Sequence, residues 1–264
     1  MTGWATGALA AGALIVASCG GAGDVDAATS ATESRTAAEV RGTVTVLAAA
    51  SLTESFEQLG DRLEEAYPGL DVVFSFGPSS GLVEQVLAGA PADLLATADT
   101  RTMAAAVEAG VVEGEPVVFA RNTLALVVPA GNPGDVHGLD DLARVELRVA
   151  LCEPQVPCGA ATERLLEADG IQAEPDTLAP DVKAATALVS LGEVDAAVVF
   201  MTDAIAEGDA VETIEVPHAA EVVNDYPIAL VRGGPNPEAA GVVVEAITGD
   251  LGQGILTEAG FLGP

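Results

Sequence analysis

Val44 to Leu52 read V-T-V-L-A-A-A-S-L, and this stretch decides the fold. Its β-branched start predicts a buried strand, and the residues that follow, L-T-E-S-F-E-Q-L-G-D-R-L-E-E, have the apolar spacing of a helix. Ser51 is therefore expected at a helix N-terminus, where backbone N–H groups lack partners and the helix dipole is positive. A serine hydroxyl added there predicts an anion site, although a plain serine N-cap has the same pattern.

The same construction recurs along the chain. Leu70–Phe76 predicts a second strand, and G-P-S-S-G then places Ser79 and Ser80 before another helix. From Thr43 onward, short apolar runs alternate with helical ones, which predicts an α/β fold of mostly parallel strands flanked by helices. A short strand is expected within 90–99, and further strands at 122–129, 148–151, 194–200 and 226–231. Further helices are expected at 101–109, 160–169, 181–191 and 238–255.

The chain is strongly acidic. Its formal net charge is −30, from 40 acidic and 10 basic residues, and Lys183 is the only lysine. Nucleic acids and anionic membrane surfaces are not expected as partners, because like charges repel. The acids are spread over predicted helix faces, which is typical of a solvated surface. A small anion must therefore be held by local dipoles, since the overall field opposes its approach.

The N-terminus predicts targeting rather than fold. Residues 8–18 are small and apolar, too few to span a bilayer, and they lead into V-A-S-C, which ends at Cys19. This resembles the lipobox of bacterial lipoproteins, which implies a signal peptide over 1–18, lipidation of Cys19 and anchoring to the cell membrane outside the cytoplasm. Met1–Ala8 lacks the usual basic residues, and an ordinary signal peptide with an incidental cysteine is the alternative. Residues 19–42 predict a flexible tether.

Cys152 and Cys158 are the remaining cysteines. Outside the cytoplasm, a close pair with two prolines between them predicts a disulfide, worth on the order of 2 kcal/mol, that stiffens the loop before the next helix. A zinc site is not expected, because no second cysteine or histidine pair lies nearby. His137 and His218 are far apart and no carboxylates cluster at ligand spacing, so no metal site is predicted.

An enzymatic alternative comes from G-P-S-S-G at Gly77–Gly81, which satisfies the nucleophile-elbow pattern G-x-S-x-G between a strand and a helix. A serine hydrolase with Ser79 as its nucleophile needs an acid and then a histidine downstream. Asp195 or Asp203, followed by His218, has that order. Short Gly/Ser patterns are common, however, and the sequence has no H-G-G-G oxyanion motif, so the hydrolase is the weaker hypothesis.

Seven stretches of the chain belong together: V-T-V-L-A-A-A-S-L-T, S-F-G-P-S-S-G-L, A-G-A-P-A-D-L-L-A-T-A-D, V-P-C-G, P-D-V-K-A-A-T-A-L-V, V-V-F-M-T-D-A and Y-P-I-A-L-V. In this order, from about Thr43 to the C-terminus, they resemble the molybdate-binding proteins of ABC transporters. The resemblance implies two α/β lobes of the type II periplasmic-binding-protein kind, joined by two crossing segments and closing on the ligand. Lobe 1 would comprise residues 43–122 and 223–264, and lobe 2 residues 123–222.

The resemblance also implies which residues hold the oxyanion. Ser51 and Ser79 would offer hydroxyl and backbone donors. Cys158 and Val182 would each offer a backbone N–H at a helix start, on the opposing lobe. The family's fifth donor is a tyrosine hydroxyl, and this sequence has Phe200 at that position.

Phe200 is a departure from the family that bears on selectivity. Losing one hydrogen bond to a charged ligand costs roughly 1.5–3 kcal/mol, or about one to two decades in affinity. Thr202, Ser80 or a water molecule would have to replace the missing hydroxyl. Otherwise the site is weaker or tuned to another anion.

These observations predict an extracytoplasmic receptor of an ABC transporter that binds molybdate, and tungstate with it, and delivers it to the membrane permease. No bond is made or broken and no cofactor is needed, so the protein is not predicted to be an enzyme. We expect a monomer. Two binding or structural alternatives stay open: a receptor for another oxyanion such as sulfate or phosphate, and an adhesive or structural surface protein.

Overall fold

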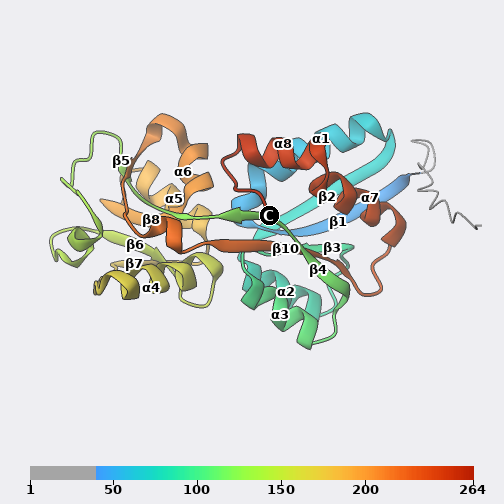
Figure 1. The fold of residues 1–264 in the computed structure, drawn as a ribbon, viewed down its shortest axis with the longest axis horizontal. Helices are drawn as coiled ribbons and strands as arrows, with labels where there is room; N and C mark the ends of the chain where they lie inside the picture. The colour runs from blue at the N-terminus through green and yellow to red at the C-terminus, as the bar shows by residue number, and fades with distance from the viewer. Residues whose placement is uncertain (1–39) are drawn as a thin grey trace, which may run out of the picture. The chain divides into compact units, whose positions relative to one another are not determined.

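The computed structural model describes residues 40–264, so the predicted signal peptide, Cys19 and most of the predicted tether lie outside the described residues. Two sheets form its framework (Figure 1). Their strands are β1 (Arg41–Ala49), β2 (Gly69–Gly77), β3 (Leu94–Ala96), β4 (Val112–Asn122), β5 (Leu124–Pro129), β6 (Val149–Cys152), β7 (Thr177–Ala179), β8 (Ala196–Phe200), β9 (Val211–Ile214) and β10 (Asn224–Val231).

The two sheets have the same topology. The first is ordered β2-β1-β3-β10-β4 and the second β7-β6-β8-β5-β9, with five strands each. In each sheet four strands point in one direction, and a single strand, β10 or β5, runs antiparallel to its neighbours. The predicted fold class, two α/β lobes with mostly parallel strands, is therefore confirmed.

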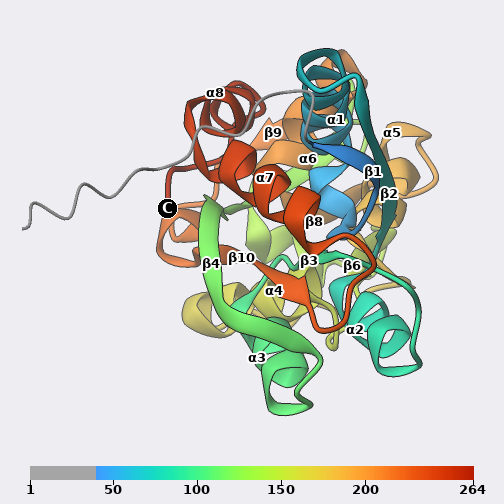
Figure 2. The same ribbon diagram turned by 90° about the vertical axis from the view of Figure 1, so that its right-hand side faces the viewer.

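Helices cover both faces of each sheet. In the first sheet, α1, α7 and α8 lie on one face and α2 and α3 on the other (Figure 2). In the second sheet, α5 and α6 lie opposite α4 (Figure 1). The helices are α1 (Thr53–Ala66), α2 (Ser79–Leu87), α3 (Thr100–Glu108), α4 (Pro157–Asp169), α5 (Val182–Ser190), α6 (Met201–Glu207), α7 (Pro237–Thr248) and α8 (Asp250–Glu258), with 3₁₀ turns at Ala50–Leu52, Leu139–Ala143, Gly208–Ala210 and Ala219–Glu221.

The apolar start of β1 is explained by its central place. β1 pairs with β2 on one side and β3 on the other, and helices cover both of its faces. Val44, Val46 and Ala48 are consequently fully buried, as is expected of a parallel strand covered on both faces. The strand runs directly into the 3₁₀ turn Ala50–Leu52 and then α1, so Ser51 lies in the first turn of a helical segment, as predicted.

Three strands, one helix and one helix boundary differ from the sequence prediction. β4, β7 and β9 were not predicted, because all three are partly exposed edge strands, and β4 contains Gly114 and Pro116. The short helix α6 was not predicted either. The single C-terminal helix predicted over 238–255 is wrong. It is interrupted at Gly249, whose extended backbone separates α7 from α8.

Among the described residues, no one helix has the length and apolar character needed to cross a membrane. The bent pair α7 and α8 meets those criteria only when the two helices are taken together, at an angle of 54°.

Gly159 determines how closely α4 can approach the loop before it. A Cβ at this position would lie 2.0 Å from the carbonyl oxygen of Glu153 and 2.8 Å from that of Cys152, which are both backbone atoms. Neither atom can move away as the end of a flexible side chain does. The first turn of α4 therefore keeps its position only with glycine here.

We expect Gly159→Ala to lower the free energy of unfolding by about 1–3 kcal/mol, because the backbone must shift to admit the methyl group. Urea unfolding of the purified protein measures this. The matched control is Gly241→Ala in α7, where a Cβ meets no atom within 4 Å. That variant should be unchanged or more stable by up to about 1 kcal/mol, and equal losses in both variants would contradict the steric argument.

Candidate functional site

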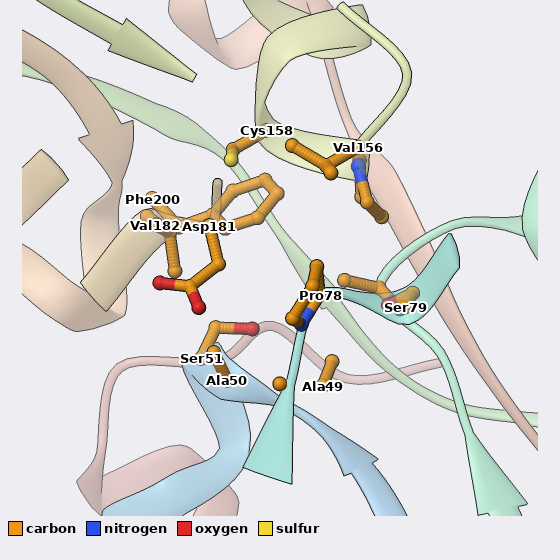
Figure 3. Close-up of a pocket in the computed structure, with 13 residues that line it drawn as sticks. Ala49, Ala50, Ser51, Pro78, Ser79, Val156, Cys158, Asp181, Val182 and Phe200 are labelled. Atoms are coloured by element: carbon orange, nitrogen blue, oxygen red, sulfur yellow. The ribbon is translucent and has the colours of Figure 1, made fainter. Parts of the chain in front are cut away.

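One small cavity lies where strands of both sheets end at their carboxyl edges (Figure 3). Its volume is about 20 Å³. In this arrangement of the lobes the cavity has room for about one water molecule. The structure brings all five residues of the predicted binding set to its wall: Ser51, Ser79, Cys158, Val182 and Phe200.

Helix starts surround the cavity. Ser79 is the first residue of α2, Cys158 the second of α4 and Val182 the first of α5, while Ser51 lies in the 3₁₀ turn before α1. Backbone N–H groups at such positions have no partners within their helix and carry the positive end of its dipole. Among the residues that line the cavity none is Lys, Arg or His. The arrangement therefore suits a small anion held by neutral donors.

Asp181 is the acidic side chain in the wall. It is the N-cap of α5, and its carboxylate accepts a hydrogen bond from the backbone N–H of Ala184 at 2.8 Å. The backbone N–H of Ala184 is therefore not available to a ligand. The N–H group of Val182, one residue after Asp181, is not used by this cap.

Ser79 is held with its oxygen already occupied as an acceptor. The backbone N–H of Ala98 donates to Ser79 Oγ at 3.0 Å, and the serine is almost fully buried. The carbonyl of Ala98 is itself fixed by Asn224 Nδ2 at 2.8 Å. Because a backbone N–H can only donate, the hydroxyl proton of Ser79 is left for another acceptor.

Ser51 has a different partner. Its Oγ lies 2.9 Å from the hydroxyl of Tyr226, which is fully buried in β10. Asn122 Nδ2 contacts the same tyrosine hydroxyl at 3.3 Å and Thr202 Oγ1 at 2.8 Å. Burial raises the pKa of Tyr226, so that its hydroxyl stays protonated. Sequence reasoning assigned Tyr226 only to a strand, and the one available signal was a polar hydroxyl in an otherwise apolar run.

Phe200 ends β8 and is buried, with its ring edge against the ring of Tyr226 at a centroid distance of 5.9 Å. Thr202 and Ser80, the two side chains expected to compensate for the missing tyrosine hydroxyl, do not line the cavity. The hydroxyl of Thr202 instead accepts a hydrogen bond from Asn122. The wall at Phe200 is therefore apolar.

The cysteine pair ties the second sheet to the cavity. Cys152 at the end of β6 and Cys158 in the first turn of α4 are joined by a disulfide with an S–S distance of 2.08 Å. Its ring contains the loop 153–157 that delivers the chain to α4. The cross-link therefore restricts the backbone of residues 156–158, which line the cavity.

The contacts of a serine hydrolase are not formed around Ser79. His218 pairs with Asp169, and Asp195 pairs with Arg148 at 2.9 Å. The hydroxyl of Ser79 bonds to a backbone amide rather than to a histidine. A nucleophile needs a base within hydrogen-bond reach, so the elbow-like sequence here serves a helix start.

An ionic cluster connects the helices next to the cavity. Lys183 in the first turn of α5 lies 2.5 Å from Glu54 Oε1 in α1 and 3.3 Å from Asp203 Oδ1 in α6. The Asp203 carboxylate is completely buried and makes no hydrogen bond within the described residues, so Lys183 is its countercharge. Among residues 40–264, no group of three or more His, Cys, Asp or Glu is arranged to hold a metal ion.

The pKa values follow from this geometry. Burial raises the pKa of Asp203 to about 7, although the charge of Lys183 opposes the shift. Burial lowers the pKa of Lys183, but Asp203 and Glu54 outweigh it, and the net pKa lies above the ordinary value. The lysine therefore stays charged.

Two lobes that meet at a small cavity lined by helix starts are typical of solute-binding proteins. The chain belongs to the bacterial extracellular solute-binding protein family, whose model matches residues 44–262. It is 39% identical over 221 residues to the molybdate-binding protein ModA of Mycobacterium tuberculosis (strain ATCC 25618 / H37Rv), a match that covers 84% of this chain and 85% of that protein.

Solved structures agree on the fold. The periplasmic molybdate-binding protein of Azotobacter vinelandii has a TM-score of 0.73 at 22% identity, over 84% of this chain and 99% of that chain. The sulfate-binding protein SubI of Mycobacterium tuberculosis H37Rv has a TM-score of 0.72 at 23% identity, over 84% and 86% of the two chains. Because these two are named for different anions, the fold alone does not identify the ligand.

Asp203 should make stability depend on pH. Between its ordinary pKa of 3.8 and about 7, the folded protein keeps a proton that the unfolded chain has released. The free energy of unfolding therefore falls as pH rises through this window. We expect Asp203→Asn to remove this decrease in the free energy of unfolding. Urea unfolding of the wild-type protein and the variant, at several pH values from acidic to mildly alkaline, measures it. Parallel profiles for the two proteins would contradict the assignment, and Asp225→Asn, an exposed ion-pair variant, is the control.

Proposed function

We propose that this protein is the extracytoplasmic receptor of an ABC transporter for molybdate, and for tungstate with it. The observation that carries the proposal is the convergence of helix starts from two sheets on a cavity without a basic side chain. The N–H of Ala98 occupies the oxygen of Ser79 and leaves the hydroxyl proton of that serine available, and the hydroxyl of Ser51 lies at the same cavity. The similarity to the molybdate-binding protein of Mycobacterium tuberculosis supports molybdate over other tetrahedral oxyanions.

Binding would use only neutral donors. Ser51 and Ser79 first capture the anion on lobe 1, and closure then adds the N–H groups of Cys158 and Val182 from lobe 2 and excludes water. In the water-poor cavity each donor interacts with the charged oxygens more strongly than it does in water. The reaction is reversible binding, so the protein is proposed to be a receptor and not an enzyme, and no cofactor takes part.

Selectivity follows from the direction of the donors and the size of the cavity. A fully deprotonated oxyanion accepts from every hydroxyl and N–H donor of the proposed set, whereas these donors offer no acceptor for the proton of a protonated oxygen. Phe200 removes one donor, which is the observation that keeps sulfate or phosphate as the second candidate ligand.

Delivery completes the proposed role. The bound anion passes to the membrane permease of the transporter, and Cys19, which lies outside the described residues, is proposed to carry the lipid anchor. We propose that the receptor is a monomer, with residues 43–122 and 223–264 in lobe 1 and residues 123–222 in lobe 2. The family description, an extracellular solute-binding protein, supports a location outside the cytoplasm.

Calorimetric titration of the purified protein with molybdate, tungstate, sulfate and phosphate tests the proposal. We expect molybdate and tungstate to bind tightly and sulfate to give no heat at the same concentration, because the relative that is 39% identical to this chain is a molybdate-binding protein. Binding of sulfate or phosphate alone would contradict the molybdate assignment and favour the second candidate. Absence of binding by all four anions would contradict the receptor itself.

We expect Ser51→Ala and Ser79→Ala each to weaken molybdate binding by about tenfold or more. Each variant removes a hydrogen bond to a charged ligand, worth about 1.5–3 kcal/mol. Ser80→Ala is the matched control, because Ser80 is the neighbour of Ser79 but does not line the cavity. Unchanged affinity in both site variants, measured by the same titration, would remove these serines from the site.

A further inference from the structure

We propose that Tyr226 is a specificity-determining positioning residue: it donates its hydroxyl proton to Ser51 and thereby makes the Ser51 hydroxyl a donor to the bound anion. The inference rests on the proposed function of the cavity and adds a residue that does not itself line it. It follows from the hydrogen-bonding capacity of each group, taken in sequence from a backbone amide to the cavity.

The direction of the network is set at Asn122. The backbone N–H of Thr123 donates to Asn122 Oδ1 at 2.9 Å. A backbone N–H never accepts, so the carbonyl side of the amide must face Thr123. The NH₂ side then faces the other two neighbours, Thr202 Oγ1 at 2.8 Å and the hydroxyl of Tyr226 at 3.3 Å. Asn122 has two amide protons for these two acceptors.

Tyr226 therefore receives a proton from Asn122 and has one of its own to give. Its hydroxyl has one other hydrogen-bonding neighbour among the described residues, Ser51 Oγ at 2.9 Å. The ring is completely buried and packs edge-on against Phe200, with two further phenylalanine rings on other sides. An unpaired hydroxyl in such surroundings is costly, so the proton is directed at Ser51.

Ser51 then has one defined role toward the ligand. Its oxygen accepts from Tyr226, and its own proton is left for the cavity, into which the side chain projects in Figure 3. Ser79 reaches the same state by another route, because the N–H of Ala98 occupies its oxygen. Both hydroxyls thus present protons to the anion, and neither offers its oxygen to the proton of a protonated oxyanion.

The network also joins the two lobes at their crossing. Asn122 is the last residue of β4 in the first sheet, and Thr202 lies in α6, which packs on the second sheet. The hydrogen bond between them is buried, and the two residues are 80 positions apart in the chain. A change in how the lobes meet would therefore reach Asn122, and through it the orientation of Tyr226 and Ser51.

Tyr226→Phe tests the inference, because it removes the hydroxyl and keeps the ring. Near neutral pH, we expect about tenfold weaker binding of molybdate, since Ser51 is free to turn its proton away. Phosphate, which carries a proton at this pH, should not be weakened, because the freed serine oxygen now accepts that proton. The ratio of molybdate to phosphate affinity should thus fall about tenfold, measured by calorimetry with phosphate competing against molybdate.

The ratio of molybdate to phosphate affinity does not change when a substitution weakens the binding of both anions equally. Equal weakening of both anions, or no change in either, would overturn the role of Tyr226. Tyr67→Phe is the matched control, because the hydroxyl of Tyr67 belongs to the C-cap residue of α1 and does not line the cavity. It should leave both affinities unchanged.

Asn122→Asp gives an independent test with the tyrosine hydroxyl still present. The carboxylate accepts from Tyr226 instead of donating to it, so the whole chain reverses and the proton of Ser51 points to Tyr226. We expect molybdate to bind at least as weakly as in Tyr226→Phe, and wild-type affinity would overturn the inference. Failure of the wild-type protein to bind molybdate is a different outcome, because it contradicts the proposed function and not the role of Tyr226. In that case the ratio is measured with sulfate, which carries no proton, against phosphate.

Discussion

A doubly charged anion and a protein with a net charge of −30 repel each other, and the rest of the structure depends on how this repulsion is overcome locally. Arginine or lysine in the cavity would be the direct solution, but neither lines it. The only lysine lies beside it and is bound by Glu54 and Asp203. What remains is the partial positive charge of helix starts, which acts at short range and is strong only where water is scarce.

Short-range dipoles require exact placement, and the repeated topology provides it. Each sheet directs the carboxyl ends of its parallel strands to the same edge, so that the connections that follow β1, β2, β6 and β7 deliver helix starts there. Small residues let the backbone approach at these connections. Gly159 is the clearest case, since its neighbours leave no room for a Cβ. The disulfide of Cys152 and Cys158 then limits movement of the same segment.

The sequence was sufficient for features that are local in the chain. Ser51 and Ser79 stand out because a strand, a serine and a helix follow one another within a few residues, and the predicted binding set does meet at one cavity. Partly exposed edge strands such as β4 escaped, since their composition is not that of a buried strand. The hydrogen-bond network of Asn122, Tyr226 and Ser51 was also not predicted from the sequence. Tyr226 and Ser51 are 175 residues apart, and no periodicity links positions that only folding brings together.

Phe200 can now be understood together with this network. A tyrosine hydroxyl at that position would be able to donate or to accept, because a hydroxyl rotates to suit its partner. Replacing it with an apolar ring removes one donor, which costs affinity, but it also removes a group that would tolerate a protonated ligand oxygen. The hydroxyls that remain in the proposed set belong to Ser51 and Ser79, and each has its oxygen occupied by another donor. The site thus has fewer donors, but the direction of each is fixed. Discrimination between deprotonated and protonated oxyanions then depends on Tyr226 and Ala98, which donate to the two serine oxygens.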